Sequence, residues 1–282
     1  MATGASQAGI LLAAHFSVRY AGKAPVLRDV ALEIRQGEIL GLVGQSGSGK
    51  STLAMAVLGL LDRKRAQLQG TIKFQDHDLL QLRERQLRGM RGRALALVLQ
   101  SPLSSLNPAL RIRTQLKEAW RAHVSGSKLD CDAAIGAALE SVSLPSNDEF
   151  LRKYPSQTSV GQAQRVLIAM AVMHRPALLI ADEATSALDV ITQSEILALF
   201  ARLNHETGTA ILYISHDLAS VAGICDRIAI LHDGHIVECG TGDQIFANPQ
   251  HEYTRRLIAA MPRVPHKISP PPLAKDASAG AS

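Results

Sequence analysis

The stretch Gly44-Gln45-Ser46-Gly47-Ser48-Gly49-Lys50-Ser51-Thr52 fits the pattern G-x-x-x-x-G-K-[ST], the phosphate-binding loop. Its glycines let the backbone curl so that successive N–H groups face one anionic point. Lys50 is then placed to reach the β- and γ-phosphates of a nucleotide, and the Ser51 hydroxyl is placed to hold Mg²⁺. All nine residues are therefore predicted to bind a nucleotide.

The residues on either side of this loop agree with that interpretation. Ile39–Val43 is an apolar run short enough for a buried strand, and Leu53–Leu58 suits a helix. The positive N-terminal end of such a helix faces the bound phosphates. A glycine-rich turn ahead of a helix, without a ligand, is the alternative.

The composition narrows the classes of partner. The chain has 282 residues, enough for one large domain or two small ones, and 46% of them are hydrophobic. Aromatic residues make up only 4%, which counts against single-stranded nucleic acid, because such proteins stack bases on aromatic rings. The net charge of +5 is mild and suits an anionic ligand or an anionic membrane as well as nucleic acid.

Nothing in the sequence indicates a disulfide framework or a membrane span. Cys131, Cys225 and Cys239 match no metal or redox spacing, so reduced thiols in a cytoplasmic protein are expected. Ile10–Ala14 is too short for a signal peptide, and no apolar run approaches 18 residues. If the protein works at a membrane, other chains must span it.

Periodicity along the chain predicts an α/β fold with a helical insertion. Strand-like segments come first, a helical pattern runs from about residue 106 to 171, and two buried-strand runs then enclose a helix. The predicted strands are Phe16–Tyr20, Val26–Ile34, Gly70–Phe74, Ala177–Ala181 and Thr209–Ile214, and the predicted helix is Ile191–Leu203. This β-α-β alternation implies a parallel sheet with ligand groups at the carboxyl ends of its strands. Asp233-Gly234 is a two-residue hairpin signal.

Three polar side chains follow two of these strands. Asp182 and Glu183 end the first, and His216 follows the second. After a phosphate loop, Asp182 is expected to act on Mg²⁺, Glu183 to take a proton from the attacking water, and His216 to contact the γ-phosphate. A carboxylate pair capping a strand, with a loop histidine nearby, is the purely structural alternative.

With these residues in order, residues 10–262 resemble the nucleotide-binding subunits of ABC transporters. By that resemblance Tyr20 stacks on adenine, and Gln100 joins the metal site to a transmembrane partner. Ser159, Gly161 and Gln162 stand at the signature segment, and Asp189 lies in a loop that crosses to a second subunit. The resemblance implies ATP and Mg²⁺ as cofactors. It also implies an ABC-type P-loop NTPase fold with a mixed sheet, an N-terminal antiparallel β part and an inserted helical subdomain at about 106–171.

A narrower likeness points to the peptide/nickel importer subgroup. Gln100–Pro108 and Asn248–Leu257 look like segments of that subgroup. Some of its members carry a cysteine-rich C-terminal extension that binds an iron–sulfur cluster. No cysteine follows Cys239, so no cluster is expected. Residues 1–9 and the Pro/Ala/Ser-rich residues 263–282 are expected to be loose tails.

The resemblance implies an ATP-hydrolysing subunit that powers an importer of peptides, nickel or a metal chelate, peripheral to the cytoplasmic side of the inner membrane. Its implied partners are a second, different ATPase subunit, two transmembrane permease subunits and a solute-binding protein, with no nucleic acid. An export ATPase, a non-transport ABC ATPase acting on nucleic acid, and a regulatory nucleotide sensor remain alternatives.

Two departures from the family pattern stand out. Ala184 replaces the proline usual after the catalytic glutamate, which is expected to be harmless in a turn. Val160 replaces a glycine of the signature. If that position needs a positive φ, which a β-branched residue rarely adopts, the segment must shift and the two ATP sites of an assembly become unequal.

Overall fold

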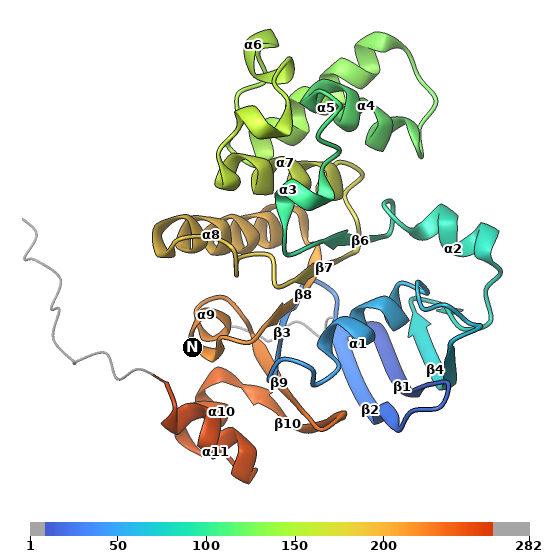
Figure 1. The fold of residues 1–282 in the computed structure, drawn as a ribbon, viewed down its shortest axis with the longest axis vertical. Coiled ribbons are helices and arrows are strands. Elements are labelled where there is room, and N and C mark those ends of the chain that lie inside the picture. The colour runs from blue at the N-terminus through green and yellow to red at the C-terminus, as the bar shows by residue number, and fades with distance from the viewer. Residues whose placement is uncertain (1–8, 262–282) are drawn as a thin grey trace, which may run out of the picture.

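Two β-sheets carry the fold, and the strand that leads into the phosphate loop lies inside the larger one. The computed structural model describes residues 9–261, so the predicted tails at 1–9 and 263–282 lie, except for Gly9, outside the described residues. Figure 1 shows the sheets in one part of the molecule and the helices of the central sequence gathered at one end.

The first sheet is antiparallel, with strand order β2-β1-β4-β5. Its strands are β1 (Ile10–Tyr20), β2 (Pro25–Arg35), β4 (Ala66–Phe74) and β5 (His77–Asp78). Alternate residues of β1, from Leu12 to Val18, are buried, whereas His15 between them is exposed. This period of two is typical of an antiparallel sheet with one face on the core and the other toward water.

The second sheet is mixed, with strand order β10-β9-β3-β8-β7-β6. Its strands are β3 (Ile39–Val43), β6 (Leu95–Val98), β7 (Leu178–Asp182), β8 (Ala210–Ser215), β9 (Arg227–His232) and β10 (His235–Thr241). All pairs are parallel except β9 with β10, which form the predicted hairpin. Asp233 (φ 46°) and Gly234 (φ 80°) both have positive φ, as a type I′ turn requires.

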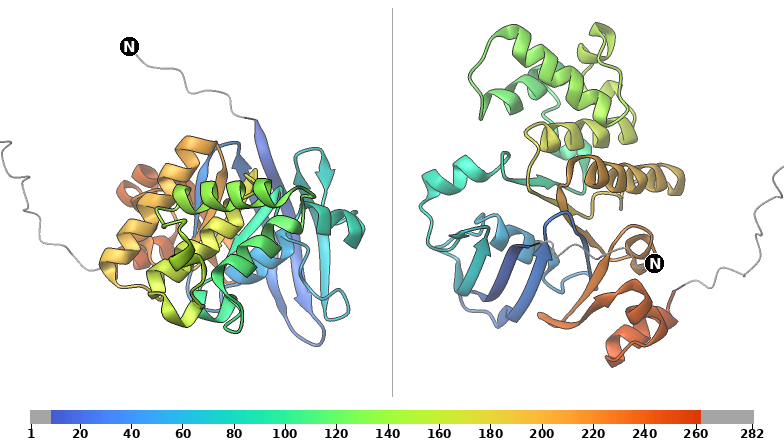
Figure 2. Two further views of the ribbon diagram at one scale, coloured as in Figure 1. Left: turned by 90° about the horizontal axis from the view of Figure 1, so that it is seen from above. Right: turned by 180° about the vertical axis from the view of Figure 1, so that it is seen from behind.

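Helices pack around the second sheet and fill the segment between β6 and β7. The helices are α1 (Lys50–Val57), α2 (Glu84–Met90), α3 (Pro102–Ser105), α4 (Ile112–Arg121), α5 (Lys128–Ser141), α6 (Asp148–Leu151), the 3₁₀ turn η1 (Pro155–Gln157), α7 (Val160–Val172), α8 (Val190–Thr207), α9 (Leu218–Ala222), α10 (Gly242–Ala247) and α11 (Glu252–Ala259). The two further views in Figure 2 show α4 to α6 stacked beyond α7, away from the antiparallel sheet.

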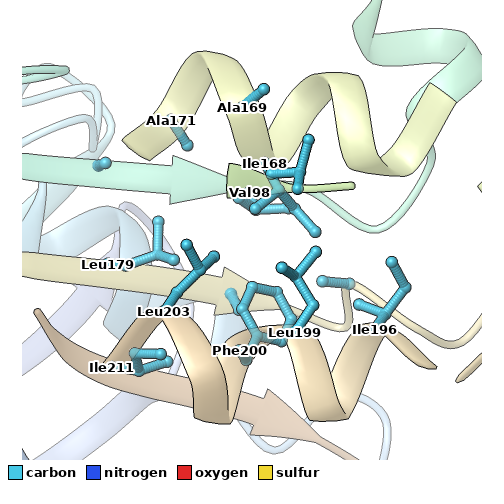
Figure 3. Close-up of a cluster of buried hydrophobic side chains, with 14 of the residues drawn as sticks. Val98, Ile168, Ala169, Ala171, Leu179, Ile196, Leu199, Phe200, Leu203 and Ile211 are labelled. Carbon is cyan, nitrogen blue, oxygen red and sulfur yellow. The ribbon is translucent and has the colours of Figure 1, made fainter. Parts of the chain in front are cut away.

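Aliphatic side chains join the helical end to the sheet. Figure 3 shows Ile168 of α7 and Val98 of β6 facing Leu199 and Phe200 of α8, all of them buried. The scarcity of aromatic residues is consistent with this packing, in which Val, Ile, Leu and Ala fill most positions.

The α/β prediction with a mixed sheet and an antiparallel β part is confirmed. The main difference concerns the first strand, which begins at Ile10 and not at Phe16. Ile10–Ala14, considered above only as a signal peptide, forms the first half of β1. Within residues 9–261, no helix is both long and apolar enough to cross a bilayer.

Gly41 allows α9 to approach β3, the strand that carries the loop. A methyl group placed on Gly41 would lie 2.1 Å from Val221 Cγ1 and 3.0 Å from Cys225 Sγ. By contrast, a methyl group on Gly136 of α5 would meet no atom within 4 Å.

We therefore expect Gly41→Ala to lower the free energy of unfolding by about 1–3 kcal/mol, because it overpacks a closed core. The matched change Gly136→Ala should raise it by about 0.5–1 kcal/mol through helix propensity. Urea titrations of the two variants measure both values. A Gly41→Ala variant as stable as the wild type would contradict the close packing of α9 on β3.

Candidate nucleotide-binding site

The phosphate loop connects the carboxyl end of β3 to the start of α1. Gly47 (φ 81°) and Gly49 (φ 107°) have positive φ, which favours glycine. A methyl group on Gly44 would lie 2.3 Å from the Leu231 carbonyl oxygen, so the loop packs directly on β9. Gly47 and Gly49 are thus needed for their backbone conformation, and Gly44 is needed because there is no room for a side chain.

Lys50 is a buried cation held by the loop itself. Its side chain is 4% exposed, and its Nζ donates hydrogen bonds to the carbonyls of Gly44 (2.8 Å) and Gln45 (3.0 Å). A buried ammonium group is stable only when such partners replace water. Because neither carbonyl carries a full charge, an incoming phosphate is a stronger partner for Lys50 than the two that hold it.

Glu183 lies between Lys50 and His216. Its Oε1 is 3.7 Å from Lys50 Nζ, and its Oε2 is 3.5 Å from His216 Nδ1. The residue follows β7 with φ 49°, and its N–H donates to the Ile214 carbonyl at 3.0 Å. A non-glycine residue in this region of φ is uncommon, and here the hydrogen bond to β8 fixes it. The structure thus brings Lys50, Glu183 and His216, all predicted from the sequence, into successive contact.

Asp182 is the last residue of β7 and lies deeper than Glu183. Burial raises the pKa of the Asp182 carboxyl, and this effect outweighs the hydrogen bond with the Ser51 hydroxyl, which lowers the pKa. Its Oδ1 is buried and has no hydrogen-bond partner in the described part of the chain. An unpartnered carboxylate oxygen beside a hydroxyl and a phosphate loop is a donor set that fits Mg²⁺, which prefers oxygen ligands.

Gln100 reaches this group through Ser186. Its Nε2 donates to Ser186 Oγ at 2.8 Å, and Ser186 Oγ donates to the Glu183 carbonyl at 3.0 Å. Gln100 follows β6 by two residues, so its side chain lies at the same sheet edge as the carboxylates. Its predicted contact with a metal stays a prediction, since the side chain of Gln100 is bonded to Ser186.

A second cluster of predicted residues lies at the starts of α7 and α8 and holds Ser159, Gly161, Gln162 and Asp189. Ser159 caps α7, and its Oγ accepts from the Gln162 N–H at 3.1 Å. Asp189 caps α8 and accepts from the N–H of Thr192 at 3.0 Å. A methyl group on Gly161 would lie 2.8 Å from Thr192 Cγ2, so the two helix starts touch. No hydrogen bond or ion pair of the described residues joins this cluster to the phosphate loop.

The expectation that Val160 has a positive φ and is therefore strained is wrong. Val160 is the first residue of α7, and it is not among the described residues with positive φ. A helical valine needs no shift of the segment, so backbone strain gives no reason for two unequal ATP sites. The side chain is 39% exposed instead.

Tyr20 ends β1, opposite Ala66 of β4, and is half-buried against the apolar cluster beneath the sheet. Its packing partners are apolar side chains, and its stacking on adenine stays a prediction.

Two aromatic residues beside the phosphate loop were missed by the sequence interpretation. The Gln45 N–H donates to the Tyr253 hydroxyl at 3.2 Å, and the Tyr253 ring stacks on His232. His232 also lines, with Gln45 to Ser48, a pocket of about 340 Å³. The sequence of the segment Asn248–Leu257 shows only a likeness to a subgroup. Nothing in it indicates that Tyr253 contacts Gln45, which lies 208 residues earlier in the chain.

With this geometry in place, comparison with known proteins identifies the family. The ABC transporter family profile matches residues 27–186. The chain belongs to the ABC transporter family. It is 38% identical to the dipeptide transport ATP-binding protein DppD of Bacillus subtilis over 268 residues, 90% of this chain and 80% of the relative. It is 40% identical to the oligopeptide transport ATP-binding protein OppD of Salmonella typhimurium over 243 residues, 86% of this chain and 72% of the relative.

Solved structures agree. The ATP-binding cassette MJ0796, in a dimeric post-hydrolysis state bound to ADP and Pi, matches 83% of this chain and 98% of its own with a TM-score of 0.70 and 26% identity. The chain is thus an ATP-binding and ATP-hydrolysing subunit of the peptide-importer type within the ABC transporter family.

The raised pKa of Asp182 predicts a stability effect in this ABC subunit. Because the folded chain binds this proton more tightly than the unfolded chain, the contribution of Asp182 is most favourable at low pH and is lost as the pH rises through the raised pKa. We expect Asp182→Asn without nucleotide to have a higher free energy of unfolding than the wild type at about pH 7, with the difference vanishing below about pH 4. Urea titrations across this pH range measure it, and a variant less stable at neutral pH would contradict the burial argument.

Proposed function

We propose that this subunit hydrolyses ATP to power the import of peptides across the cytoplasmic membrane, acting at its cytoplasmic face. The observation that carries the proposal is that Glu183 contacts both Lys50, at the end of the phosphate loop, and His216. Peptide as the cargo is supported by the names of the dipeptide and oligopeptide relatives. Nickel or a metal chelate is the alternative cargo.

The contacts of Glu183 with Lys50 and His216 suggest how ATP hydrolysis proceeds. When the phosphates of ATP attract Lys50, the carboxylate of Glu183 loses its neighbouring cation and is free to accept a proton from water. That water attacks the γ-phosphorus, the bond to the β-γ bridging oxygen breaks, and ADP leaves. His216, on the far side of Glu183, is placed to contact the γ-phosphate and to orient the carboxylate.

Mg²⁺, when bound, neutralises charge that develops on the phosphates. Asp182 and Ser51 are the residues that would hold it, with Gln100 beside them. The support is the unpartnered Asp182 Oδ1 and the oxygen character of this donor set.

The second cluster supports a partner subunit. Ser159, Gly161 and Asp189 lie together but apart from the chain's own phosphate loop, so we propose that they act on ATP bound to a second, different ATPase subunit. Two permease subunits and a solute-binding protein complete the proposed importer, and α4 to α6 form the helical subdomain of this one. Neither nucleic acid nor an iron–sulfur cluster has a role in it.

Glu183→Gln tests the chemistry and the cargo together. This change keeps the size of the side chain but removes the base, so we expect ATP turnover by the assembled transporter to fall by about 10²–10⁴-fold while ATP binding persists. Uptake of labelled di- and oligopeptides into cells should fall in parallel. ATPase assays, equilibrium binding and uptake measure the three quantities.

Glu206→Gln is the matched control, because Glu206 is exposed on α8 and makes no ion pair in the described part of the chain. It should leave all three quantities unchanged. Wild-type turnover in Glu183→Gln would refute the assignment of the base. Loss of nickel uptake with peptide uptake intact would replace the proposed cargo by the metal.

A further inference from the structure

The C-terminal part of the described chain reaches the phosphate loop at Tyr253. This residue lies in α11, is 6% exposed, and accepts a hydrogen bond from the Gln45 N–H at 3.2 Å. It is not among the residues that the sequence predicts to bind nucleotide. Figure 1 shows α11 and β10 together at the end of the molecule opposite the helical insertion.

The hydrogen bond completes the fixation of one peptide group of the loop. The Gly44 carbonyl accepts from Lys50 at 2.8 Å, and the Gln45 N–H of the same peptide donates to Tyr253. Because the peptide is planar, partners on both its oxygen and its N–H fix its orientation. Phosphate oxygens replace the Gly44 carbonyl as the partner of Lys50, whereas the Gln45 N–H is already occupied by the Tyr253 hydroxyl. The tyrosine is therefore the partner that keeps this peptide in place once nucleotide is bound.

One contact holds the tyrosine ring, and a second holds its backbone. His232, the last residue of β9, stacks on it with ring centroids 3.8 Å apart and an interplanar angle of 11°. The Tyr253 N–H donates to His251 Nδ1 at 3.1 Å. A buried ring with a stacked neighbour and a bonded backbone has little freedom to move its hydroxyl away from Gln45.

A carboxylate on β10 anchors the segment that precedes Tyr253. Glu238 accepts from the N–H of Gln250 at 2.8 Å and from the N–H of His251 at 3.0 Å. A continuous set of contacts thus runs from β10 through residues 250–251 to Tyr253 and the phosphate loop. Each step uses a hydrogen bond to a backbone N–H, so it fixes the course of the chain and not only one side chain.

We propose that Tyr253 is a positioning residue of the ATP site, which holds the Gly44–Gln45 peptide so that the N–H groups that follow converge on the phosphates. Through it, α11 sets the affinity for ATP without touching the nucleotide. This inference rests on ATP binding at the phosphate loop, and it does not depend on the cargo or on the partner subunits.

Tyr253→Phe in the full-length chain is the test, because it keeps the ring and the stacking and removes only the hydroxyl. We expect the Kd for ATP with Mg²⁺ to rise about fivefold, the change that one ordinary hydrogen bond produces. Turnover at saturating ATP should stay within about twofold, since the reacting groups are untouched. The Gln45 amide should exchange its hydrogen several times faster in nucleotide-free protein, as measured by NMR.

Two further variants keep the test decisive. Tyr154→Phe, at a ring that lies 5.7 Å from the Arg111 guanidinium, removes a hydroxyl outside the site and should change neither Kd nor exchange. His232→Ala, which removes the stacking partner, should weaken ATP binding in the same direction as Tyr253→Phe. His232→Phe, which keeps an aromatic face, should weaken it less.

An unchanged Kd for ATP in folded Tyr253→Phe would overturn the inference, and so would unchanged amide hydrogen exchange at Gln45. A variant that loses turnover but binds ATP normally would also overturn it. Thermal unfolding checks that the variant is folded. If Tyr253→Phe were unfolded, a normal Kd in His232→Ala would also overturn it. Wild-type protein that binds ATP but supports no peptide uptake would refute the proposed function and leave this inference standing.

Discussion

The whole site depends on a buried lysine whose two hydrogen bonds go to neutral carbonyls and whose nearest counter-charge is a single carboxylate. Lys50 is held by two loop carbonyls, and the nearest carboxylate oxygen, on Glu183, is 3.7 Å away. In a largely dehydrated position this ammonium group attracts anions strongly. The loop therefore presents a cation whose two hydrogen-bond partners are neutral and weaker than the phosphate that would replace them.

The sheet explains why these groups meet. β3, β7 and β8 are adjacent and parallel, so the loop after β3, the carboxylates at the end of β7 and the histidine after β8 lie at one edge. Ligand sites form at the carboxyl ends of such strands. Gly41 contributes at a distance, because it leaves room for α9 to pack closely on β3.

Much of this arrangement could be predicted from the sequence, because its signals are local. The loop residues 44–52, the pair Asp182-Glu183 at a strand end, and the turn Asp233-Gly234 each depend on a few neighbouring residues. The contact of Tyr253 with Gln45 could not be predicted, since it depends on where α11 comes to lie. The conformation of Val160 was equally hidden, because a helix start accepts valine and a positive-φ turn does not. The strand at Ile10–Ala14 was not predicted for a different reason: a short apolar run carries no periodicity that identifies a strand.

The division into two clusters supports the proposal that a second subunit completes the ATP site. One cluster holds the phosphate loop and the carboxylates, and the other holds the capped starts of α7 and α8. Val160, Val190 and Ile191 leave apolar surface beside the second cluster, exposed by 39%, 82% and 74%. This exposed apolar surface is consistent with the proposed contact with a second subunit.

The most direct test of the central claim is a crystal structure of the chain with Mg²⁺ and a non-hydrolysable ATP analogue. We expect Lys50 Nζ to leave the carbonyls of Gly44 and Gln45 and to lie within hydrogen-bond distance of the β- and γ-phosphates. Asp182 and Ser51 should face the metal. A structure in which the nucleotide is bound while Lys50 still donates to both carbonyls would contradict the account.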